Sequence, residues 1–363
     1  MRTRTILIMA GGTGGHVFPG LAVADYLRES GWHVVWLGTK AGMELELVPQ
    51  HGYETEAISF SGLRGKRLAV WFMLPLRLIK AFWQSVRIIQ RVKPDVILGM
   101  GGYPAFPGGM MASLLNKPLV IHEQNSLPGL TNRILAKLAD KILLGFPDAM
   151  LTDKGKTICS GNPVRSEITQ VEAPEKRFLG RQGKLKLLVV GGSLGAKILN
   201  TVVPQALKLI PENLRPAVVH QVGALHLEPV KKVYADLQLE GEAVAFIDDM
   251  AKRYATCDLV LCRAGALTIA ELSAAGVASI LVPYPYAVDD HQTSNARLLS
   301  DHGAAVLLPQ SELTAQKLAG LLSNLTREQL LSMAMIARRM AKPEATRVVA
   351  EACIELSGVL NEA

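Results

Sequence analysis

The chain lacks several features that would assign it to a well-defined class of protein. Its four cysteines show neither metal-ligand spacing nor a dense disulfide pattern, which indicates a reducing cytosol. The longest apolar run, at 68–76, contains Pro75 and is far too short to cross a bilayer. No targeting segment is expected, because residues 1–4 lead directly into an apolar run. No nucleic-acid-binding module is evident either, so we expect no nucleic-acid partner.

What the chain does have is length, apolar residues and positive charge. Its 363 residues make two domains the natural expectation, and a 49% share of hydrophobic residues can fill two sizeable cores. The formal net charge of +7 favours anionic partners. Since no nucleic-acid module is present, a nucleotide or an anionic lipid is the expected partner.

The stretch GGTGGH at 11–16 is the most informative segment. It follows a short apolar run at 6–9 that is typical of a buried strand, and it precedes apolar residues at helical spacing. Because glycine lacks Cβ, such a turn can adopt left-handed angles and present backbone N–H groups to an anion such as phosphate. His16 is the titratable side chain of this loop. The alternative is that the glycines only make a tight turn that packing requires.

The glycine motif recurs in the second half of the chain. An apolar run at 187–190 is followed by GGSLG at 191–195 and by a helical pattern at 196–209, and the two clusters begin 180 residues apart, at Gly11 and Gly191. Neither cluster fits the dinucleotide pattern G-x-G-x-x-G cleanly, and neither has the lysine and hydroxyl residue of a P-loop. Two similar halves, each opening with a phosphate-type loop, predict two doubly wound α/β domains that face one another.

The spacing of apolar segments predicts a parallel sheet in each half. In the first half, strands are expected at 5–9, 33–37, 95–98, 118–121 and 141–144, and helices near 18–30, 43–50, 75–92, 104–115 and 129–138. In the second half, strands are expected near 187–190, 217–221, 243–246, 258–261, 279–282 and 305–308, with a last helix at 344–358. Strands that alternate with helices form parallel sheets, whose ligands bind at the carboxyl ends of the strands. The loops 11–16, 99–103 and 122–125 are predicted to lie there.

The segment CRAGALTIAE at 262–271 is the strongest candidate site of the second half. It follows a predicted strand, and the N–H groups of 265–268 at the start of a helix could hold a pyrophosphate or sugar hydroxyls. Glu271 lies about one turn into this helix, where it either accepts hydrogen bonds from both hydroxyls of a ribose or only stabilises the helix dipole. The polar cluster DDHQTSNA at 289–296 either binds hydroxyls and an amide or caps the next helix.

One segment of the first half combines basic and apolar residues. Trp71 and Phe72 precede the helix expected at 75–92, on which Arg77 and Lys80 begin a basic face. The apolar face of that helix is expected to carry Leu76, Ile79, Trp83, Val86 and Ile89. Basic residues beside an aromatic and aliphatic patch are what contact with an anionic membrane surface requires. The alternative is an ordinary crossover helix with a solvated basic face.

These segments belong to a longer series of motifs that runs along almost the whole chain. They are GGTGGH at 11–16, SGLRGK at 61–66, GMGGY at 99–103, HEQN at 122–125, GNPVR at 161–165, GGS at 191–193, FIDDM at 246–250, CRAGA at 262–266 and DHQ at 290–292. In this order they resemble the MurG family of bacterial UDP-N-acetylglucosamine transferases. Any one motif is modest evidence, whereas nine in the right order are highly specific.

The resemblance implies a fold, a reaction and a location. The fold is GT-B, with two Rossmann-like domains across a cleft: an acceptor- and membrane-binding domain at 1–163, onto which a final helix at 344–363 packs back, and a donor-binding domain at 164–343. The reaction moves N-acetylglucosamine, with inversion, from UDP-N-acetylglucosamine to the C4 hydroxyl of the muramoyl sugar on undecaprenyl diphosphate. This step turns lipid I into lipid II in peptidoglycan synthesis. The implied location is peripheral, at the cytoplasmic face of the inner membrane.

Carried over motif by motif, the resemblance also implies site residues. Contacts with the donor fall on Thr13, Gly14, Gly15, Asn125, Arg165, Ser193, Ile247, Ala266, Leu267, Thr268, Ile269, Ala270, Glu271 and Gln292. The diphosphate of the acceptor is expected at Gly14, Gly15, Gly101, Gly102 and Tyr103, and membrane contact at Trp71, Phe72, Arg77 and Lys80. Arg165 and Ser193 would hold the leaving diphosphate from the second domain. His16 is the expected general base, because a histidine at a helix N-terminus is kept neutral.

No cofactor and no metal ion are expected. The pairs Asp248-Asp249 and Asp289-Asp290 have no obvious third ligand, and a cationic cleft can replace a metal ion.

Two other functions stay open at this point. A UDP-sugar 2-epimerase shares the architecture but would need no lipid patch and a different acid/base set. A module that binds a lipid diphosphate or a nucleotide would show no catalysis.

Overall fold

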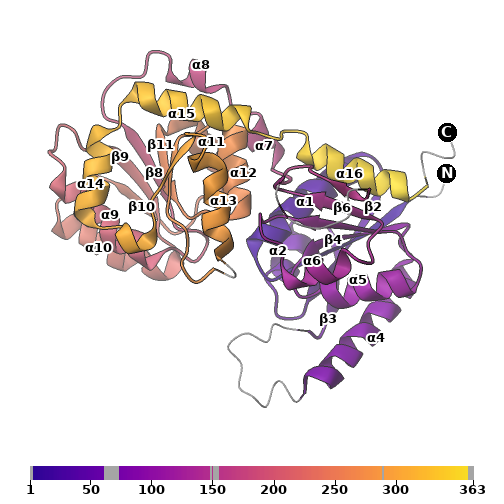
Figure 1. The fold of residues 1–363 in the computed structure, drawn as a ribbon. Helices are drawn as coiled ribbons and strands as arrows, with labels where there is room; N and C mark the ends of the chain where they lie inside the picture. Colours follow the sequence, from indigo (N-terminus) through magenta and orange to yellow (C-terminus); the bar gives the residue numbers. More distant parts are fainter. Residues whose placement is uncertain (1–2, 61–72, 148, 150–154, 288–289, 359–363) are drawn as a thin grey trace. The chain divides into compact units, whose positions relative to one another are not determined.

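The computed structural model describes residues 3–60, 73–147, 149, 155–287 and 290–358 (Figure 1). The chain divides into two compact units, and each is described here by itself. The first unit comprises Met1–Arg165 and Pro343–Ala363, and the second comprises Ser166–Lys342. The motif SGLRGK at 61–66 and the predicted membrane residues Trp71 and Phe72 lie outside the described residues.

The first unit is built on a parallel sheet. Its strands are β1 (Thr5–Ala10), β2 (His33–Thr39), β3 (Glu54–Ile58), β4 (Val96–Gly101), β5 (Leu119–Glu123), β6 (Lys141–Leu144) and β7 (Thr157–Ile158). They lie in the order β3-β2-β1-β4-β5-β6-β7, and each neighbouring pair is parallel. The helices are α1 (Gly14–Glu29), α2 (Glu44–Gln50), α4 (Leu74–Val92), α5 (Ala105–Leu114), α6 (Leu130–Leu135) and α16 (Ala345–Leu356). The strand order reverses between β1 and β4, which is where sheets of this kind bind ligands.

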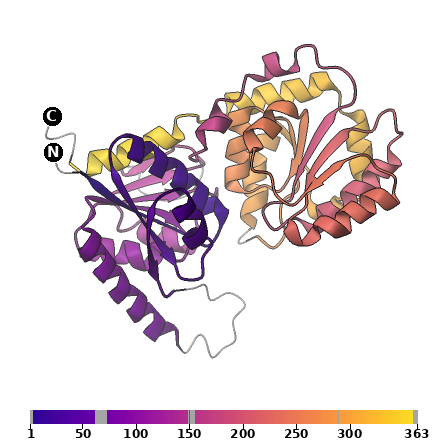
Figure 2. The ribbon, with the colours of Figure 1, turned by 180° about the vertical axis from the view of Figure 1, so that it is seen from behind.

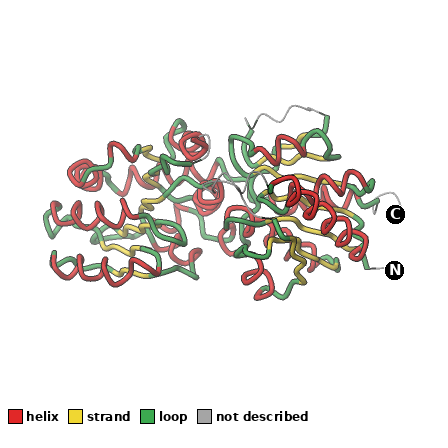
Figure 3. Tube along the Cα trace, turned by 90° about the horizontal axis from the view of Figure 1, so that it is seen from below, coloured by secondary structure: helices red, strands yellow, loops and turns green. Residues whose placement is uncertain are grey.

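Both faces of this sheet are covered, as β1 shows. Ile6 and Ile8 point into a core shared with α1 and α16, whereas Leu7 and Met9 point into a core shared with α4 and α5. All four side chains are fully buried. Alternate residues of a strand face opposite sides of its sheet, so a strand between two helical layers must be apolar throughout. The tube in Figure 3 shows the strands between helices.

The last helix belongs to the first unit, although more than 170 residues of the second unit separate it from the rest (Ser166–Lys342). Val349, Ala350 and Cys353 of α16 are buried in the same core as Leu21 and Ala24 of α1, and the two helices are in contact. Lys141 forms an ion pair with Glu355. Figures 1 and 2 both show α16 lying along this unit.

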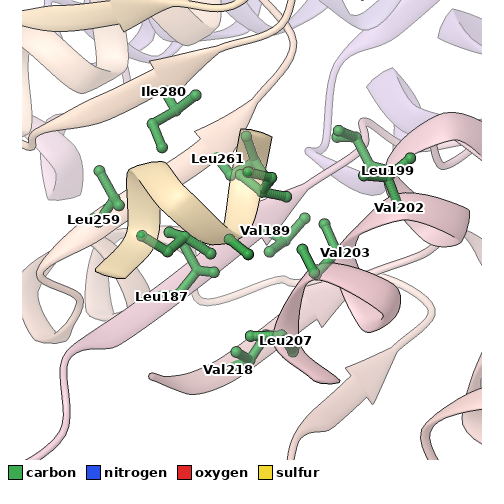
Figure 4. Packing of buried hydrophobic residues seen from close by; sticks show 14 of the residues in the cluster. Leu187, Val189, Leu199, Val202, Val203, Leu207, Val218, Leu259, Leu261 and Ile280 are labelled. Atoms are coloured by element: carbon green, nitrogen blue, oxygen red, sulfur yellow. The ribbon is translucent and has the colours of Figure 1, made fainter. Parts of the chain in front are cut away.

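The second unit repeats the architecture. Its strands are β8 (Lys186–Val190), β9 (Ala217–Gln221), β10 (Glu242–Val244), β11 (Leu259–Cys262), β12 (Ser279–Leu281) and β13 (Ala305–Leu307), in the parallel order β10-β9-β8-β11-β12-β13. The helices are α7 (Ser166–Thr169), α8 (Pro174–Phe178), α9 (Lys197–Leu209), α10 (Leu227–Asp236), α11 (Met250–Thr256), α12 (Ala266–Ala275), α13 (His291–Ser300), α14 (Ala315–Asn324) and α15 (Arg327–Arg339). Figure 4 shows side chains of β8, β9, β11, β12 and α9 that belong to one buried apolar cluster. The order reverses here between β8 and β11.

The two sheets confirm the predicted α/β class, and most elements lie where the apolar pattern placed them. The sequence analysis missed β3, because its residues ETEAI alternate glutamate with small side chains and only Ile58 is buried. It also missed the two-residue strand β7. Helix α1 begins at Gly14 rather than near residue 18, because the glycines of the loop form its first turn.

The packing of α16 predicts that it stabilises the first unit. Val349→Ala removes two fully buried methyl groups, so the free energy of unfolding of this unit should fall by about 2 kcal/mol. All four tryptophans (Trp32, Trp36, Trp71 and Trp83) belong to the first unit, so tryptophan fluorescence during urea unfolding reports on it.

The matched control is Val203→Ala, a fully buried valine of the second unit. This variant should have the same midpoint of urea unfolding as wild type when unfolding is followed by tryptophan fluorescence. Equal shifts in the two variants, or none in Val349→Ala, would contradict a role of α16 in the first unit.

Candidate functional site

The loop at 11–16 leads from β1 into α1 at the first reversal of strand order. Gly12 has a φ of 87°, a left-handed conformation that favours glycine. Thr13 is the N-cap residue, but its side chain makes no capping hydrogen bond, and the first turn of α1 contains no acidic residue. The first N–H groups of a helix have no acceptor within it, so Gly14 and Gly15 present donors to an anion.

A second glycine pair brings the loop after β4 against this one. A Cβ on Gly102 would lie 2.1 Å from the carbonyl oxygen of Gly11, and a Cβ on Gly101 would lie 3.0 Å from Nδ1 of His16. Both glycines have a positive φ, 97° at Gly101 and 81° at Gly102. The half-exposed Tyr103 ring lies beside Gly12. The predicted diphosphate residues of the two loops therefore meet at one edge of the sheet.

Glu44 holds the loop at 11–16 in place, and the sequence analysis did not identify this residue. Its fully buried carboxylate accepts hydrogen bonds from the N–H of Gly12 at 3.2 Å and from the N–H and hydroxyl of Thr39 at 2.8 and 2.9 Å. A buried carboxylate needs such donors to offset its lost hydration. The signal in the sequence was a glutamate at the start of a helix, which is also an ordinary position for an acid.

The third loop of this edge, at 122–125, reaches His16 directly. Nδ1 of His16 lies 3.0 Å from Oε1 of Gln124. The buried carboxylate of Glu123 accepts from the backbone N–H of Asn125 at 2.9 Å and from its side-chain amide at 3.3 Å. His16 and Asn125 are partly exposed, so a substrate can reach both.

Arg165 lies at the end of the first unit and not in the second unit, to which the sequence analysis had assigned it. Its guanidinium carbon is 5.8 Å from the centre of the Phe18 ring, which belongs to α1. The boundary between the units therefore falls two residues after Pro163.

The second unit forms a similar edge where β8 and β11 lie side by side. A Cβ on Gly195 would lie 1.9 Å from the carbonyl oxygen of Val222, so the loops after β8 and β9 touch only because Gly195 lacks one. Gln221, which is buried, donates to the carbonyl of Gly192 at 2.9 Å and accepts from the N–H of Ile247 at 3.0 Å. It links two predicted ligand segments, and the sequence analysis did not find it. Ser193 is exposed on the glycine loop.

Ile247 is one of the predicted donor contacts. Its N–H is already bonded to Gln221, and the residue is 5% exposed. This leaves the carbonyl as the backbone group for a ligand. The neighbouring Phe246 side chain is 50% exposed and can serve as an apolar wall.

Helix α12 carries the remaining predicted residues of this edge. Its N-cap residue Gly265 has no side chain to cap it, and its first turn has no acid. Glu271 is buried and accepts a hydrogen bond from the Tyr254 hydroxyl at 3.1 Å. The side-chain oxygen of Gln292 accepts from the N–H groups of Ala264 and Tyr284 at 3.3 and 2.9 Å. Residues 266–271 and Gln292 therefore share one edge of the sheet.

Comparison with known proteins identifies the family of this chain. Models of the glycosyltransferase family 28 N-terminal and C-terminal domains match residues 6–144 and 186–350. The chain is 64% identical over 357 residues to a UDP-N-acetylglucosamine--N-acetylmuramyl-(pentapeptide) pyrophosphoryl-undecaprenol N-acetylglucosamine transferase of Nitrosospira multiformis, covering 98% of this chain and 100% of that protein. The protein of the same name from Nitrosomonas europaea is 63% identical, with the same coverage. The crystal structure of Acinetobacter baumannii MurG is 40% identical and superposes with a TM-score of 0.82 over 97% of this chain and 99% of that one.

The chain belongs to the MurG family, within glycosyltransferase family 28. This confirms the resemblance drawn from the nine motifs and the predicted GT-B fold of two Rossmann-like domains.

Helix α4 of this MurG-family chain exposes an apolar stripe. Met73, Leu76, Ile79 and Trp83 are between 50% and 63% exposed. The buried side of the helix consists of Ala81, Ser85, Ile88 and Ile89. The expected single apolar face is therefore wrong: Ile89 packs in the core, whereas Leu76, Ile79 and Trp83 face outward. Lys80 is exposed and Arg77 partly so, and the Arg87 guanidinium lies 4.0 Å from the Trp83 ring centre.

The described residues also bear on metal binding and on membrane crossing. No three His, Cys, Asp or Glu side chains in that part of the chain are grouped as a metal ion requires; Asp289 lies outside it. No helix among the described residues combines the length and apolarity needed to cross a bilayer.

His122 predicts a pH dependence of the stability of the first unit. Burial lowers its pKa from 6.5 to about 4. Above pH 6.5 the imidazole is neutral in both states. As the pH falls from 6.5 to 4, the unfolded chain takes up a proton that the folded chain does not, so the free energy of unfolding should fall by roughly 3 kcal/mol through this residue.

His122→Gln should remove that part of the slope when unfolding is followed by tryptophan fluorescence between pH 6.5 and 4. His51→Gln, at an exposed position of the same unit, is the matched control. Parallel pH profiles for wild type and His122→Gln would contradict the assignment.

Proposed function

We propose that the chain transfers N-acetylglucosamine from UDP-N-acetylglucosamine to the N-acetylmuramyl sugar of a pyrophosphoryl-undecaprenol-linked acceptor, forming lipid II. The full-length identity with transferases of that name supports the reaction. In the molecule itself, the main support is that the strand order reverses once in each sheet. The helices after the strands at these reversals, α1, α9 and α12, have no side-chain cap and no acid in their first turn. Such helix ends suit two substrates that each contain a diphosphate.

The two alternatives left open by the sequence are less well supported. The relatives' names describe sugar transfer and not epimerisation. A module that only binds would not need a partly exposed histidine held at a helix N-terminus beside a phosphate-type loop.

We assign the donor mainly to the second unit. The N–H groups at the start of α12, together with Ser193, would bind the diphosphate. Glu271 would accept hydrogen bonds from the ribose hydroxyls, and the Ile247 carbonyl would accept one from the uracil ring beside Phe246. The amide nitrogen of Gln292 would donate to a sugar hydroxyl, because its oxygen is already bonded to backbone. Further donor contacts proposed from the first unit are Thr13, Gly14, Gly15, Asn125 and Arg165.

We assign the acceptor to the glycine loops of the first unit, with its diphosphate on Gly14, Gly15, Gly101, Gly102 and Tyr103. His16 would act as the general base. It takes the proton of the acceptor's C4 hydroxyl while that oxygen attacks the anomeric carbon, and the bond from that carbon to the phosphate oxygen breaks with inversion. The departing UDP keeps the electron pair of that bond. Arg165 and the helix N-termini would stabilise its charge.

We also propose that α4 brings the enzyme to the membrane, peripherally and at the cytoplasmic face. Its outward stripe of Met73, Leu76, Ile79 and Trp83 would insert shallowly, as the apolar face of an interfacial helix does. Lys80 and Arg87 beside it would attract anionic headgroups at about 1 kcal/mol per charge. A polyprenyl-linked acceptor stays in the bilayer, so an enzyme that uses it must bind that surface.

Paired variants in a transfer assay test the assigned roles. With labelled UDP-N-acetylglucosamine and a short-chain lipid I analogue, wild type should form the disaccharide. His16→Gln should lower kcat by about 10²–10⁴-fold with little change in donor KM. Glu271→Gln should chiefly raise donor KM. Epimerised product would overturn the proposed reaction, binding without turnover would leave only a binding module, and near-normal kcat in His16→Gln would remove His16 as the base.

Vesicle co-sedimentation tests the membrane surface. Binding should rise with the content of anionic lipid and fall with added salt, because headgroup attraction is screened. The double variant Ile79→Ser/Trp83→Ser should weaken binding and activity on membrane-embedded acceptor while sparing a short-chain soluble acceptor. The control is Leu209→Ser/Leu214→Ser, which changes two leucines of the second unit that are similarly exposed. Equal binding to neutral and anionic vesicles would return α4 to the ordinary-helix alternative.

A further inference from the structure

A chain of three hydrogen bonds links His16 to a backbone carbonyl. Nδ1 of His16 lies 3.0 Å from Oε1 of Gln124, and Nε2 of Gln124 lies 3.1 Å from Nδ1 of His122. Nε2 of His122 lies 3.0 Å from the carbonyl oxygen of Gly161. Both Gln124 and His122 are at most 2% exposed, so water does not compete for these bonds.

The direction of every bond follows from the carbonyl at its end. A carbonyl oxygen only accepts, so Nε2 of His122 must carry a proton. Burial lowers the pKa of His122 to about 4, so the ring is neutral and its Nδ1 is an acceptor. The amide nitrogen of Gln124 donates to it.

The same amide nitrogen has a second acceptor that fixes its orientation. It donates to the backbone carbonyl of His122 at 3.3 Å. Exchanging the amide oxygen and nitrogen would turn the oxygen toward two acceptors at once, which is unfavourable. Asn162 adds a bond to the carbonyl of Gln124 at 3.0 Å and holds the backbone of this residue.

The oxygen of Gln124 therefore faces His16. Since an amide oxygen only accepts, Nδ1 of His16 must donate to it, and the lone pair of a neutral ring is then on Nε2. Gly101 leaves room for this ring position, because a Cβ there would lie 3.0 Å from Nδ1 and Cε1.

We propose that Gln124 and His122 are positioning residues that hold His16 as its Nδ1–H tautomer, with Nε2 as the proton acceptor toward the acceptor hydroxyl. The catalytic consequence rests on the proposed role of His16 as general base, whereas the tautomer itself does not. Neutral imidazole in water mainly carries its proton on Nε2, a form in which that nitrogen cannot take a proton. Gln124 thus selects the reactive form before substrate binds.

The tautomer is measurable without turnover. In the full chain labelled with ¹⁵N-histidine, long-range ¹H–¹⁵N correlation spectra distinguish a protonated from an unprotonated ring nitrogen, and the His16 signals are those lost in His16→Gln. Wild type should show His16 with protonated Nδ1 and unprotonated Nε2. Gln124→Met, which cannot accept, should shift His16 toward the Nε2–H form.

Kinetics with the soluble lipid I analogue provide the second arm. Gln124→Met should lower kcat by about 10²-fold or more while donor KM keeps its wild-type value. The matched control is Gln84→Met, a partly buried glutamine of the same unit that accepts from Ser59 N–H at 2.8 Å; it should retain wild-type kcat. Thermal unfolding and UDP binding check that each variant is folded.

The possible failures are distinct. An Nε2–H form of neutral His16 in wild type would overturn the inference, whatever the reaction. Near-normal kcat in Gln124→Met with a strong loss in His16→Gln would overturn it too while leaving His16 as the base. Near-normal kcat in His16→Gln would overturn the proposed base, and the spectra would still decide the tautomer.

Discussion

The close approach of a glycine to the backbone of a neighbouring loop is the constraint on which the rest of each unit depends. Gly102 sits against the carbonyl of Gly11 in the first unit, and Gly195 sits against that of Val222 in the second. A Cβ would lie 2.1 Å from this oxygen at Gly102 and 1.9 Å from it at Gly195. Both distances are too short for any side chain, so only glycine fits at these positions. The helices that follow the first loop of each unit, α1 and α9, have no side chain hydrogen-bonded to their N-termini.

Single buried polar side chains hold these loops in place. Glu44 joins the loop after β1 to the end of β2, Glu123 folds the loop after β5, and Gln221 joins two loops of the second unit. A buried carboxylate or amide is costly unless its hydrogen bonds are made, so each position tolerates little alternative geometry. Donors that are fixed before a substrate arrives need no reorganisation during the reaction.

The two units share a strand order but differ in how their outer helices are packed. In the first unit α16 completes the helical layer over α1, and α4 keeps an apolar stripe outside the core. In the second unit, hydrogen bonds instead tie the end of α12 to neighbouring segments: Arg177 donates to the carbonyls of Tyr254 and Ala275. The difference agrees with the proposal that the first unit meets a lipid surface and the second unit binds the nucleotide.

The sequence by itself determined the alternation of strands and helices, the glycine loops and the position of His16. These depend on local period and on residues within a few positions of one another, and glycine clusters leave few backbone alternatives. Local pattern failed at β3, whose glutamates give no strand signal, and at α4, where periodicity groups apolar residues but does not say which of them the sheet covers.

Only the tertiary structure decided the partners of the site residues. Gln124 meets His16 from 108 positions away, and Glu44 reaches Gly12 from 32 positions away. The sequence analysis placed HEQN at the correct edge but could not show that its glutamine and histidine set the proton on His16. Directions of hydrogen bonds follow from which donor faces which acceptor, and that is fixed only when parallel strands bring distant loops together.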